Sequence, residues 1–236
     1  MSEIDIDTKA SEWNDSYVRR ENHVFYPGDE VVRFVARHIR RRKGLDEFED
    51  VVPGASGAKV LDVGCGIGRV LVFGTQMGLS MYGSDLSTYA VDVARKWLET
   101  AGVADAAERV VAGDVRDLAW ADGFFDHAIS DSVLDSMPFQ VAQAAVSELA
   151  RVVRPGGFLY CSLISGDETG RDSNFCGEEV VRASHEHNTI QSYFNRTKIR
   201  RLIEPLFEIL SSSLHQVRTF PGGSHHGRWH VVARRR

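Results

Sequence analysis

The sequence predicts an α/β fold in which a mostly parallel, doubly wound sheet is covered by helices. Strand-like and helix-like segments alternate between residues 59 and 163, a glycine-rich loop follows the first strand, and successive strands end on aspartates. Parallel strands joined by helical crossovers bring their carboxyl ends to one edge of the sheet, where ligands bind in such folds. We therefore expect a binding site at that edge.

The glycine-rich loop lies in the stretch Val-Leu-Asp-Val-Gly-Cys-Gly-Ile-Gly-Arg-Val, residues 60–70. Glycines at alternate positions let backbone N–H groups approach a ligand, and the helix that follows adds the positive end of its dipole. A dinucleotide fingerprint would need a glycine where Arg69 stands, and no Gly-Lys-Ser or Gly-Lys-Thr follows, so NAD and a P-loop are both disfavoured.

Before the loop, apolar residues at helical spacing predict a helix after Pro27 and Asp29. The basic run Arg37–Lys43 is expected to close that helix, because cations complement exposed carbonyl groups. Residues 44–58, which contain acids, glycines and a proline, are expected to form a surface connection.

After the loop helix, a strand is expected at Met81–Ser84, ending at Asp85, and Ser87 is expected to cap the next helix, which Gly102 stops. Further strands are predicted at 109–112, followed by Asp114, and at 127–130, followed by Asp131.

The last part of the chain is expected to contain two helices and three strands. The helices are predicted at 139–153 and 198–206, and the strands at 158–163, 208–219 and 228–233. The terminal arginines 234–236 are expected to be frayed.

Composition places the chain among globular proteins and predicts a cytoplasmic location. It has 236 residues, 43% of them hydrophobic, with no apolar run long enough to span a bilayer and no signal-peptide core at the N-terminus. Its three cysteines are too scattered for a disulfide framework, and its formal charge of −5 makes nucleic acid an unlikely partner. We expect a monomer or homodimer, without membrane association.

The motif Asp-Val-Gly-Cys-Gly-Ile-Gly, followed in order by Asp85, Asp114 and Asp131, resembles the class I S-adenosylmethionine-dependent methyltransferases over about residues 59–163. The resemblance implies a Rossmann-like, doubly wound seven-stranded sheet of order 3-2-1-4-5-7-6 with the last strand antiparallel and helices on both faces, and S-adenosyl-L-methionine as cofactor. We expect one methyltransferase domain over 1–236, with an N-terminal helical segment (1–45), a cofactor-binding core (59–163), an acceptor-side insertion (164–196) and a C-terminal helix with an antiparallel strand pair (197–236).

The resemblance also assigns roles to residues. Asp85 would accept hydrogen bonds from the ribose hydroxyls, Asp114 from the adenine amino group, and Asp131 would lie beside the transferred methyl group. The candidate cofactor-binding residues are Asp62, Gly64, Cys65, Gly66, Gly68, Asp85, Leu86, Asp114, Val115, Asp131, Tyr17 and Arg33. For Arg33, a surface salt bridge is an equal alternative, and Asp117 competes with Asp114.

The reaction expected from this resemblance is methyl transfer to a small molecule, most readily to a hydroxyl oxygen. Asp131 and His187 are the candidate catalytic residues, with Asp135 and His185 as further candidates for a base. The histidines near 225–230 offer no convincing metal-ligand spacing, so no metal is expected.

Two alternatives stay open: an RNA or protein methyltransferase, and a cofactor-binding protein without turnover. Residues 165–193 are too long for a plain connection, and their glycines and acids suggest a mobile lid over the acceptor.

Overall fold

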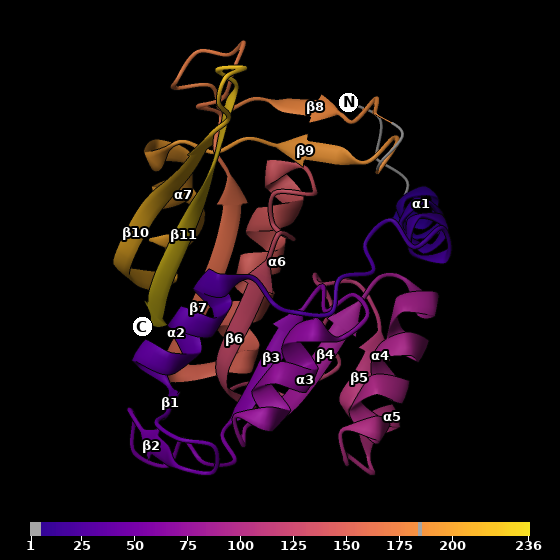
Figure 1. Ribbon diagram of the computed structural model, residues 1–236, viewed down its shortest axis with the longest axis vertical. Coiled ribbons are helices and arrows are strands. Elements are labelled where there is room, and N and C mark those ends of the chain that lie inside the picture. Colours follow the sequence, from indigo (N-terminus) through magenta and orange to yellow (C-terminus); the bar gives the residue numbers. More distant parts are fainter. Residues whose placement is uncertain (1–5, 184–185) are drawn as a thin grey trace. The chain divides into compact units, whose positions relative to one another are not determined.

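The computed structural model of the protein describes residues 6–183 and 186–236, with the side chains of residues 6–8 left out (Figure 1). The chain forms two compact units, Met1–Ala119 with Val180–Thr189 (unit 1) and Trp120–Glu179 with Ile190–Arg236 (unit 2). The single-domain arrangement expected from the sequence stays a prediction.

Seven strands form a mixed sheet in the order β10-β11-β7-β6-β3-β4-β5. Numbered along the chain, this order is 3-2-1-4-5-7-6, and the last strand, β11, runs antiparallel to its neighbours β7 and β10, as expected. The bounds of the strands are β3 Lys59–Val63, β4 Ser80–Asp85, β5 Val110–Ala112, β6 Phe125–Asp131, β7 Val153–Ile164, β10 Phe207–Arg218 and β11 His225–Arg235.

Unit 1 contains the glycine-rich loop and the parallel strands β3, β4 and β5. β3 pairs with β4 and β4 with β5, all in parallel. The helices are α1 Ile6–Val18, α2 Asp29–His38, α3 Arg69–Gln76, α4 Thr88–Thr100 and α5 Ala106–Arg109. Ser87 caps α4 as predicted, because its hydroxyl accepts a hydrogen bond from the Ala90 amide at 3.2 Å. Arg109, expected in a strand, instead ends α5, where it pairs with Asp105 at 2.8 Å.

The basic run Arg37–Lys43 was predicted to close the helix, and this is correct only for Arg37, which lies in the last turn of α2. The helix ends at His38, and β1 Arg40–Arg42 pairs with β2 Phe48–Asp50 in an antiparallel hairpin. Arg40 pairs with Asp50 at 3.0 Å and its guanidinium lies 4.7 Å from the centroid of the Phe48 ring. Cross-strand charge pairing and cation–π contact therefore stabilise an extended backbone here.

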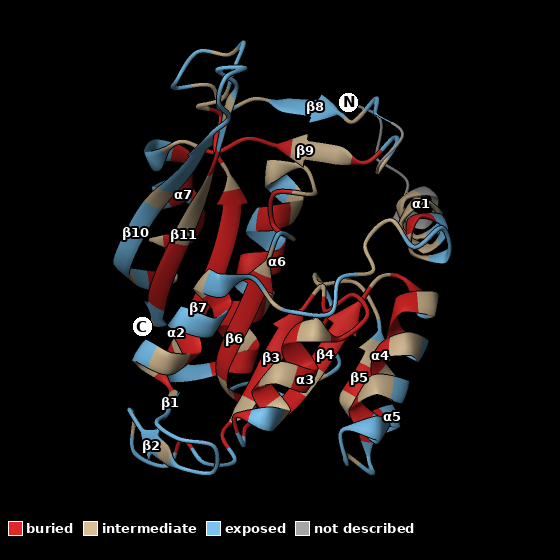
Figure 2. Ribbon diagram, viewed as in Figure 1, coloured by how far each residue is buried: buried red, intermediate tan, exposed pale blue. Residues whose placement is uncertain are grey.

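Unit 2 contains the parallel pair β6–β7 and the antiparallel strands β11 and β10. Its helices are α6 Phe139–Val152 and α7 Arg196–Ile203, and β8 Glu178–Val180 and β9 Ile190–Ser192 form a separate two-stranded sheet. β7 begins earlier than predicted because Phe125 pairs with Val153 and His127 with Phe158, so residues 154–157 bulge from the ladder. In Figure 2 the central strands of each unit are buried along most of their length.

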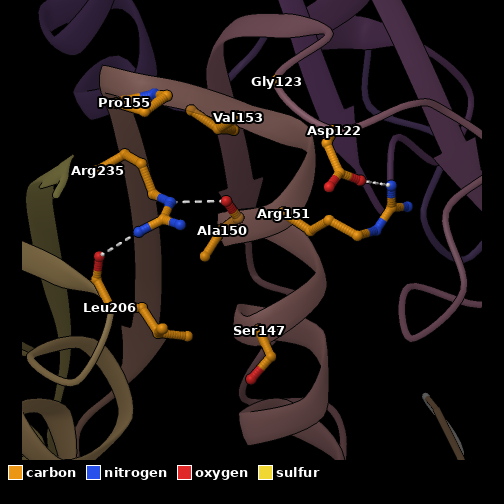
Figure 3. Close-up of a pocket in the computed structure, with 9 residues that line it drawn as sticks. All are labelled: Asp122, Gly123, Ser147, Ala150, Arg151, Val153, Pro155, Leu206 and Arg235. Atoms are coloured by element: carbon orange, nitrogen blue, oxygen red, sulfur yellow. Dashed lines mark hydrogen bonds and ion pairs between the residues drawn. The ribbon is translucent and has the colours of Figure 1, made fainter.

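The C-terminal arginines are ordered, contrary to prediction, because β11 continues to Arg235. Arg235 Nε donates to the Ala150 carbonyl at 2.7 Å and Nη1 to that of Leu206 at 3.3 Å, beside a depression of about 520 Å³ (Figure 3). The guanidinium thus satisfies a carbonyl in the last turn of α6, where a cation also complements the helix dipole. Among the described residues, no helix is long and apolar enough to cross a bilayer.

His127, in the middle of β6, is expected to make stability depend on pH. Its ring is buried and stacked on Phe158, and its Nδ1 accepts the Phe158 amide proton at 3.1 Å. Burial lowers the pKa of His127 from 6.5 to about 4, so the native state resists protonation that the unfolded state accepts. This contribution is complete above pH 6.5 and is lost as pH falls to about 4, by about 3 kcal/mol in all.

Urea unfolding of the wild type and of His127→Gln, measured from about pH 7 down to about pH 4, checks this prediction. Over that range the unfolding free energy should fall much less in the variant than in the wild type. His226→Gln, at an exposed site, controls for general loss of an imidazole. Equal slopes for the wild type and His127→Gln would contradict the assignment.

Candidate functional site

In unit 1, the glycine-rich loop after β3 is held against the end of β4. The amides of Gly64 and Cys65 donate to the Ser84 carbonyl at 2.7 and 3.1 Å, and the Gly66 amide donates to Asp85 Oδ2 at 2.8 Å. Gly66 has a φ of +51°, a left-handed conformation that favours glycine. The loop is therefore shaped by its hydrogen bonds to the strand that follows it.

Asp85 is the buried carboxylate that joins the loop to α4. Its second oxygen, Oδ1, accepts the Ser87 amide proton at 2.9 Å. Burial raises the pKa of Asp85, and the hydrogen bonds from the Ser87, Gly66 and Leu86 amides oppose that rise. Because each carboxylate oxygen has two lone pairs, Asp85 can accept further hydrogen bonds from a ligand.

Tyr17 brings a hydroxyl group from α1 to the loop. A Cβ atom built on Gly66 would lie 2.5 Å from the Tyr17 hydroxyl oxygen, so any other residue at position 66 would have to displace the end of the Tyr17 side chain. Burial, with the nearby Asp85 charge, raises the pKa of Tyr17 well above its ordinary value, which keeps the phenol protonated. The result is a hydrogen-bond donor beside the glycine cradle.

Asn14, which sequence reasoning missed as a functional residue, fixes α1 in this position. Its side-chain oxygen accepts from the Ser87 hydroxyl at 2.9 Å and from the Tyr89 amide at 3.0 Å, at the start of α4. The available signal was its place in the stretch Trp13–Tyr17, one helical turn before Tyr17. Asn14 thereby links the N-terminal helix to the same turn that Asp85 supports.

Asp114, after β5, lies at the predicted strand end but is already bound to a cation. Arg116 Nη2 lies 2.6 Å from Asp114 Oδ2, and the Arg116 amide donates to Asp114 Oδ1 at 2.9 Å. Burial raises the pKa of Asp114, but the hydrogen bonds from Arg116 outweigh this and the net shift is downward. Contact with adenine stays a prediction for Asp114, as it does for the half-buried Leu86 and Val115.

Three further predicted cofactor residues also belong to unit 1. Arg33, on α2, pairs with Glu30 at 2.5 Å and with Asp29 at 3.6 Å, which is the surface salt bridge weighed above. Asp62 is buried near the end of β3. The Cys65 thiol is also buried, and its burial together with the nearby Asp85 charge raises the pKa of the thiol well above its ordinary value. Cofactor contacts of these three residues are untested predictions.

In unit 2, the candidate catalytic residue Asp131 ends β6. Its Oδ1 accepts the Ser162 hydroxyl proton at 2.7 Å, and the next residue, Ser132, has a φ of +63°. Asp135 is 1% exposed and pairs with Arg228 at 2.9 Å. A buried, ion-paired Asp135 is less available as a base than Asp131.

The histidines are dispersed. His187 is exposed in a turn of unit 1, with Nδ1 3.2 Å from the Ala183 carbonyl oxygen, and His185 lies outside the described residues. In unit 2, His225 pairs with Asp167 at 3.3 Å and His230 with the Tyr160 hydroxyl at 2.8 Å. Within 6–183 and 186–236, no group of three His, Cys, Asp or Glu side chains is arranged to hold a metal ion.

The part of the acceptor-side insertion that belongs to unit 2 is organised around Arg171. The guanidinium lies 4.2 Å from the Tyr193 ring centroid and 4.9 Å from that of Phe175, and it pairs with Glu179 at 2.6 Å. These residues of the insertion are thus held together by packing and charge. Its closure over an acceptor stays a prediction.

Comparison with known proteins supports the interpretation of the glycine loop. Residues 61–161 match the family model of the methyltransferase domain. A malonyl-[acyl-carrier protein] O-methyltransferase from Pectobacterium atrosepticum is 30% identical over 160 residues, which are 60% of this chain and 58% of that protein. A ubiquinone biosynthesis O-methyltransferase from Thiobacillus denitrificans is 36% identical over 137 residues, 56% of this chain and 57% of that protein. The chain thus spans under two thirds of the length of either relative.

A solved structure has the same fold over the whole chain. Magnesium protoporphyrin IX methyltransferase from Synechocystis PCC 6803, with bound S-adenosylmethionine, superposes with a TM-score of 0.67 at 18% identity and covers 100% of both chains. The glycine loop, the strand order and these similarities together show a methyltransferase domain of the class I S-adenosylmethionine-dependent type over residues 61–161.

Proposed function

We propose that this protein transfers the methyl group of S-adenosylmethionine to a hydroxyl oxygen of a small molecule by in-line displacement. The observation that carries the proposal is the contact of the Gly66 amide with the buried Asp85 carboxylate, beside the Tyr17 hydroxyl. These groups fit an adenosyl cofactor for two reasons. Asp85 can accept hydrogen bonds from the ribose hydroxyls, and glycine at position 66, having no side chain, lets a ligand approach the backbone closely.

The cofactor supplies a methyl group already activated by its sulfonium sulfur. The protein's own contribution is then to bind the adenosine, align the acceptor and exclude water. In this proposal Asp85 holds the ribose, Tyr17 covers the glycine loop, and Asp131 receives the proton that the acceptor hydroxyl loses. His187 is the other candidate from the sequence, although it lies exposed in a turn.

Oxygen as the attacking atom is supported by the names of the two relatives described above, each an O-methyltransferase. A small acceptor is supported by the formal charge of −5, which gives no general attraction to a nucleic-acid backbone. A cytoplasmic location is proposed from the composition, and a monomeric or homodimeric state stays a prediction.

Incubation with methyl-labelled S-adenosylmethionine and a fractionated metabolite extract tests the proposed reaction. We expect label in a small molecule, as a methyl ether or ester, with release of S-adenosylhomocysteine. Label in RNA or protein alone would favour the macromolecular alternative. Cofactor binding without transfer to any fraction would favour the non-catalytic one.

Asp85→Asn is expected to weaken S-adenosylhomocysteine binding by about 10-fold to 100-fold, the range of a charged hydrogen bond to a ligand. The amide nitrogen of asparagine would also face the Gly66 or Ser87 amide, each of which now donates to the carboxylate. Isothermal calorimetry measures the change. Asp46→Asn, at an exposed acid between β1 and β2, is the matched control and should bind normally.

Gly66→Val is expected to abolish binding of S-adenosylhomocysteine, because the new side chain would fill the space between the loop and Tyr17. Gly57→Val is the matched control, since Gly57 also has a positive φ, +77°, but a Cβ atom built on it would meet no atom within 4 Å. The two variants share the backbone strain and differ in the close approach. Equal affinity in both would refute the role assigned to Gly66.

A further inference from the structure

Four polar side chains of unit 2, at the ends of β6, β7 and β11, form one chain of hydrogen bonds. Asp131 Oδ1 lies 2.7 Å from Ser162 Oγ, which lies 3.2 Å from Arg228 Nη1. The same nitrogen of Arg228 lies 2.9 Å from Asp135 Oδ2. The register of the strands supports this grouping, because Asp131 is opposite Ser162 on β7 and Arg228 is opposite Ile164.

The direction of the Ser162 proton follows from counting donors and acceptors. A serine hydroxyl has one proton to donate and two lone pairs. Ser162 Oγ accepts the Ser132 amide proton at 2.9 Å and a proton of Arg228 Nη1 at 3.2 Å, and both of these groups can only donate. Its own proton is therefore directed to Asp131 Oδ1, which must accept.

Arg228 is itself held in place by Asp135. The Asp135 carboxylate is 1% exposed, and its Oδ2 also accepts the Ile164 amide proton at 2.7 Å. The Asp135 carbonyl oxygen accepts the Ser192 amide proton at 2.7 Å, near the C-terminal end of the acceptor-side insertion. A buried carboxylate bound in this way keeps its cationic partner fixed, although 32% of the Arg228 side chain is exposed.

The backbone beside Asp131 is strained in a way that the same hydrogen bonds maintain. Ser132 has a φ of +63°, which a residue with a Cβ atom rarely adopts. Its amide donates to Ser162 Oγ, so one hydroxyl group holds both the side chain of Asp131 and the turn that follows it. Such strained turns persist where the surrounding structure over-determines them, and they cluster at functional sites.

We propose that Ser162 and Arg228 are positioning residues for Asp131 during methyl transfer: Arg228 orients the Ser162 hydroxyl, and this hydroxyl holds the Asp131 carboxylate in one rotamer. The inference rests on the proposed function, in which Asp131 receives the acceptor's proton. Removing the hydroxyl takes away one contact that fixes the orientation of the carboxylate, which lowers the rate of the chemical step while ground-state binding is retained.

Ser162→Ala tests the proposal, with Ser162→Thr as the conservative variant that keeps the hydroxyl. We expect kcat to fall about 10-fold to 100-fold in the alanine variant, with the acceptor KM and the S-adenosylhomocysteine Kd changed by less than about 3-fold. The threonine variant should recover most of kcat. Ser130→Ala is the matched control: Ser130 is a buried serine of β6 whose hydroxyl has no hydrogen-bond partner within the described part of the chain.

A double-mutant cycle with Asp131→Asn separates positioning from a merely structural role. If Ser162 acts through Asp131, then Ser162→Ala should lower kcat by less than about 2-fold in the Asp131→Asn background. Full additivity of the two changes would overturn the proposal. It would also be overturned if Ser162→Ala and Ser130→Ala had equal kcat.

Arg228→Lys gives a second route if Ser162→Ala does not fold. Lysine retains the charge opposite Asp135, but its ammonium ends one bond short of the Nη1 position that contacts both Asp135 and Ser162, so its effect on kcat should also vanish in the Asp131→Asn background. Arg234→Lys, at an exposed arginine of β11 paired with Glu208, is the control. A wild-type protein that methylates no acceptor would refute the proposed function, whereas an active wild type with additive cycles would refute this inference alone.

Discussion

The hydrogen bond from the Gly66 amide to the buried Asp85 carboxylate is the constraint on which the cofactor site depends. It joins the glycine-rich loop after β3 to the end of β4, and the other oxygen of Asp85 accepts the amide proton of Ser87, the residue before α4. The same turn receives Asn14 from α1, which brings Tyr17 to the loop. One carboxylate thus organises the loop, the start of α4 and, indirectly, the helix that covers them.

The central elements of this arrangement could be predicted because their signals are local. Alternate glycines, an aspartate ending the next strand and a serine before the following helix each leave a short pattern, and the structure places Gly66, Asp85 and Ser87 accordingly. The strand order was also correct, although it came from the family resemblance. The Arg40–Arg42 segment shows where a local pattern fails, because Asp50 and Phe48, supplied by the partner strand, select an extended backbone over a helix end.

The residues that sequence reasoning missed have partners far away in the chain. Ser162 lies 31 residues from Asp131 and 66 from Arg228, so no spacing rule would connect them. Arg116 was missed for a different reason. It is close to Asp114 in sequence, but Asp114 was expected to bind a ligand, so a partner within the protein was not considered for it. In both cases tertiary geometry decides which acids are engaged within the protein.

The central claim is that Asp85 and the glycine cradle bind the adenosyl part of S-adenosylmethionine. A crystal structure with S-adenosylhomocysteine tests it most directly. The account predicts both ribose hydroxyls within hydrogen-bond distance of the Asp85 carboxylate and the thioether chain passing over Gly66. A ligand bound elsewhere, or ribose hydroxyls out of hydrogen-bond distance of Asp85 at saturating ligand, would contradict it.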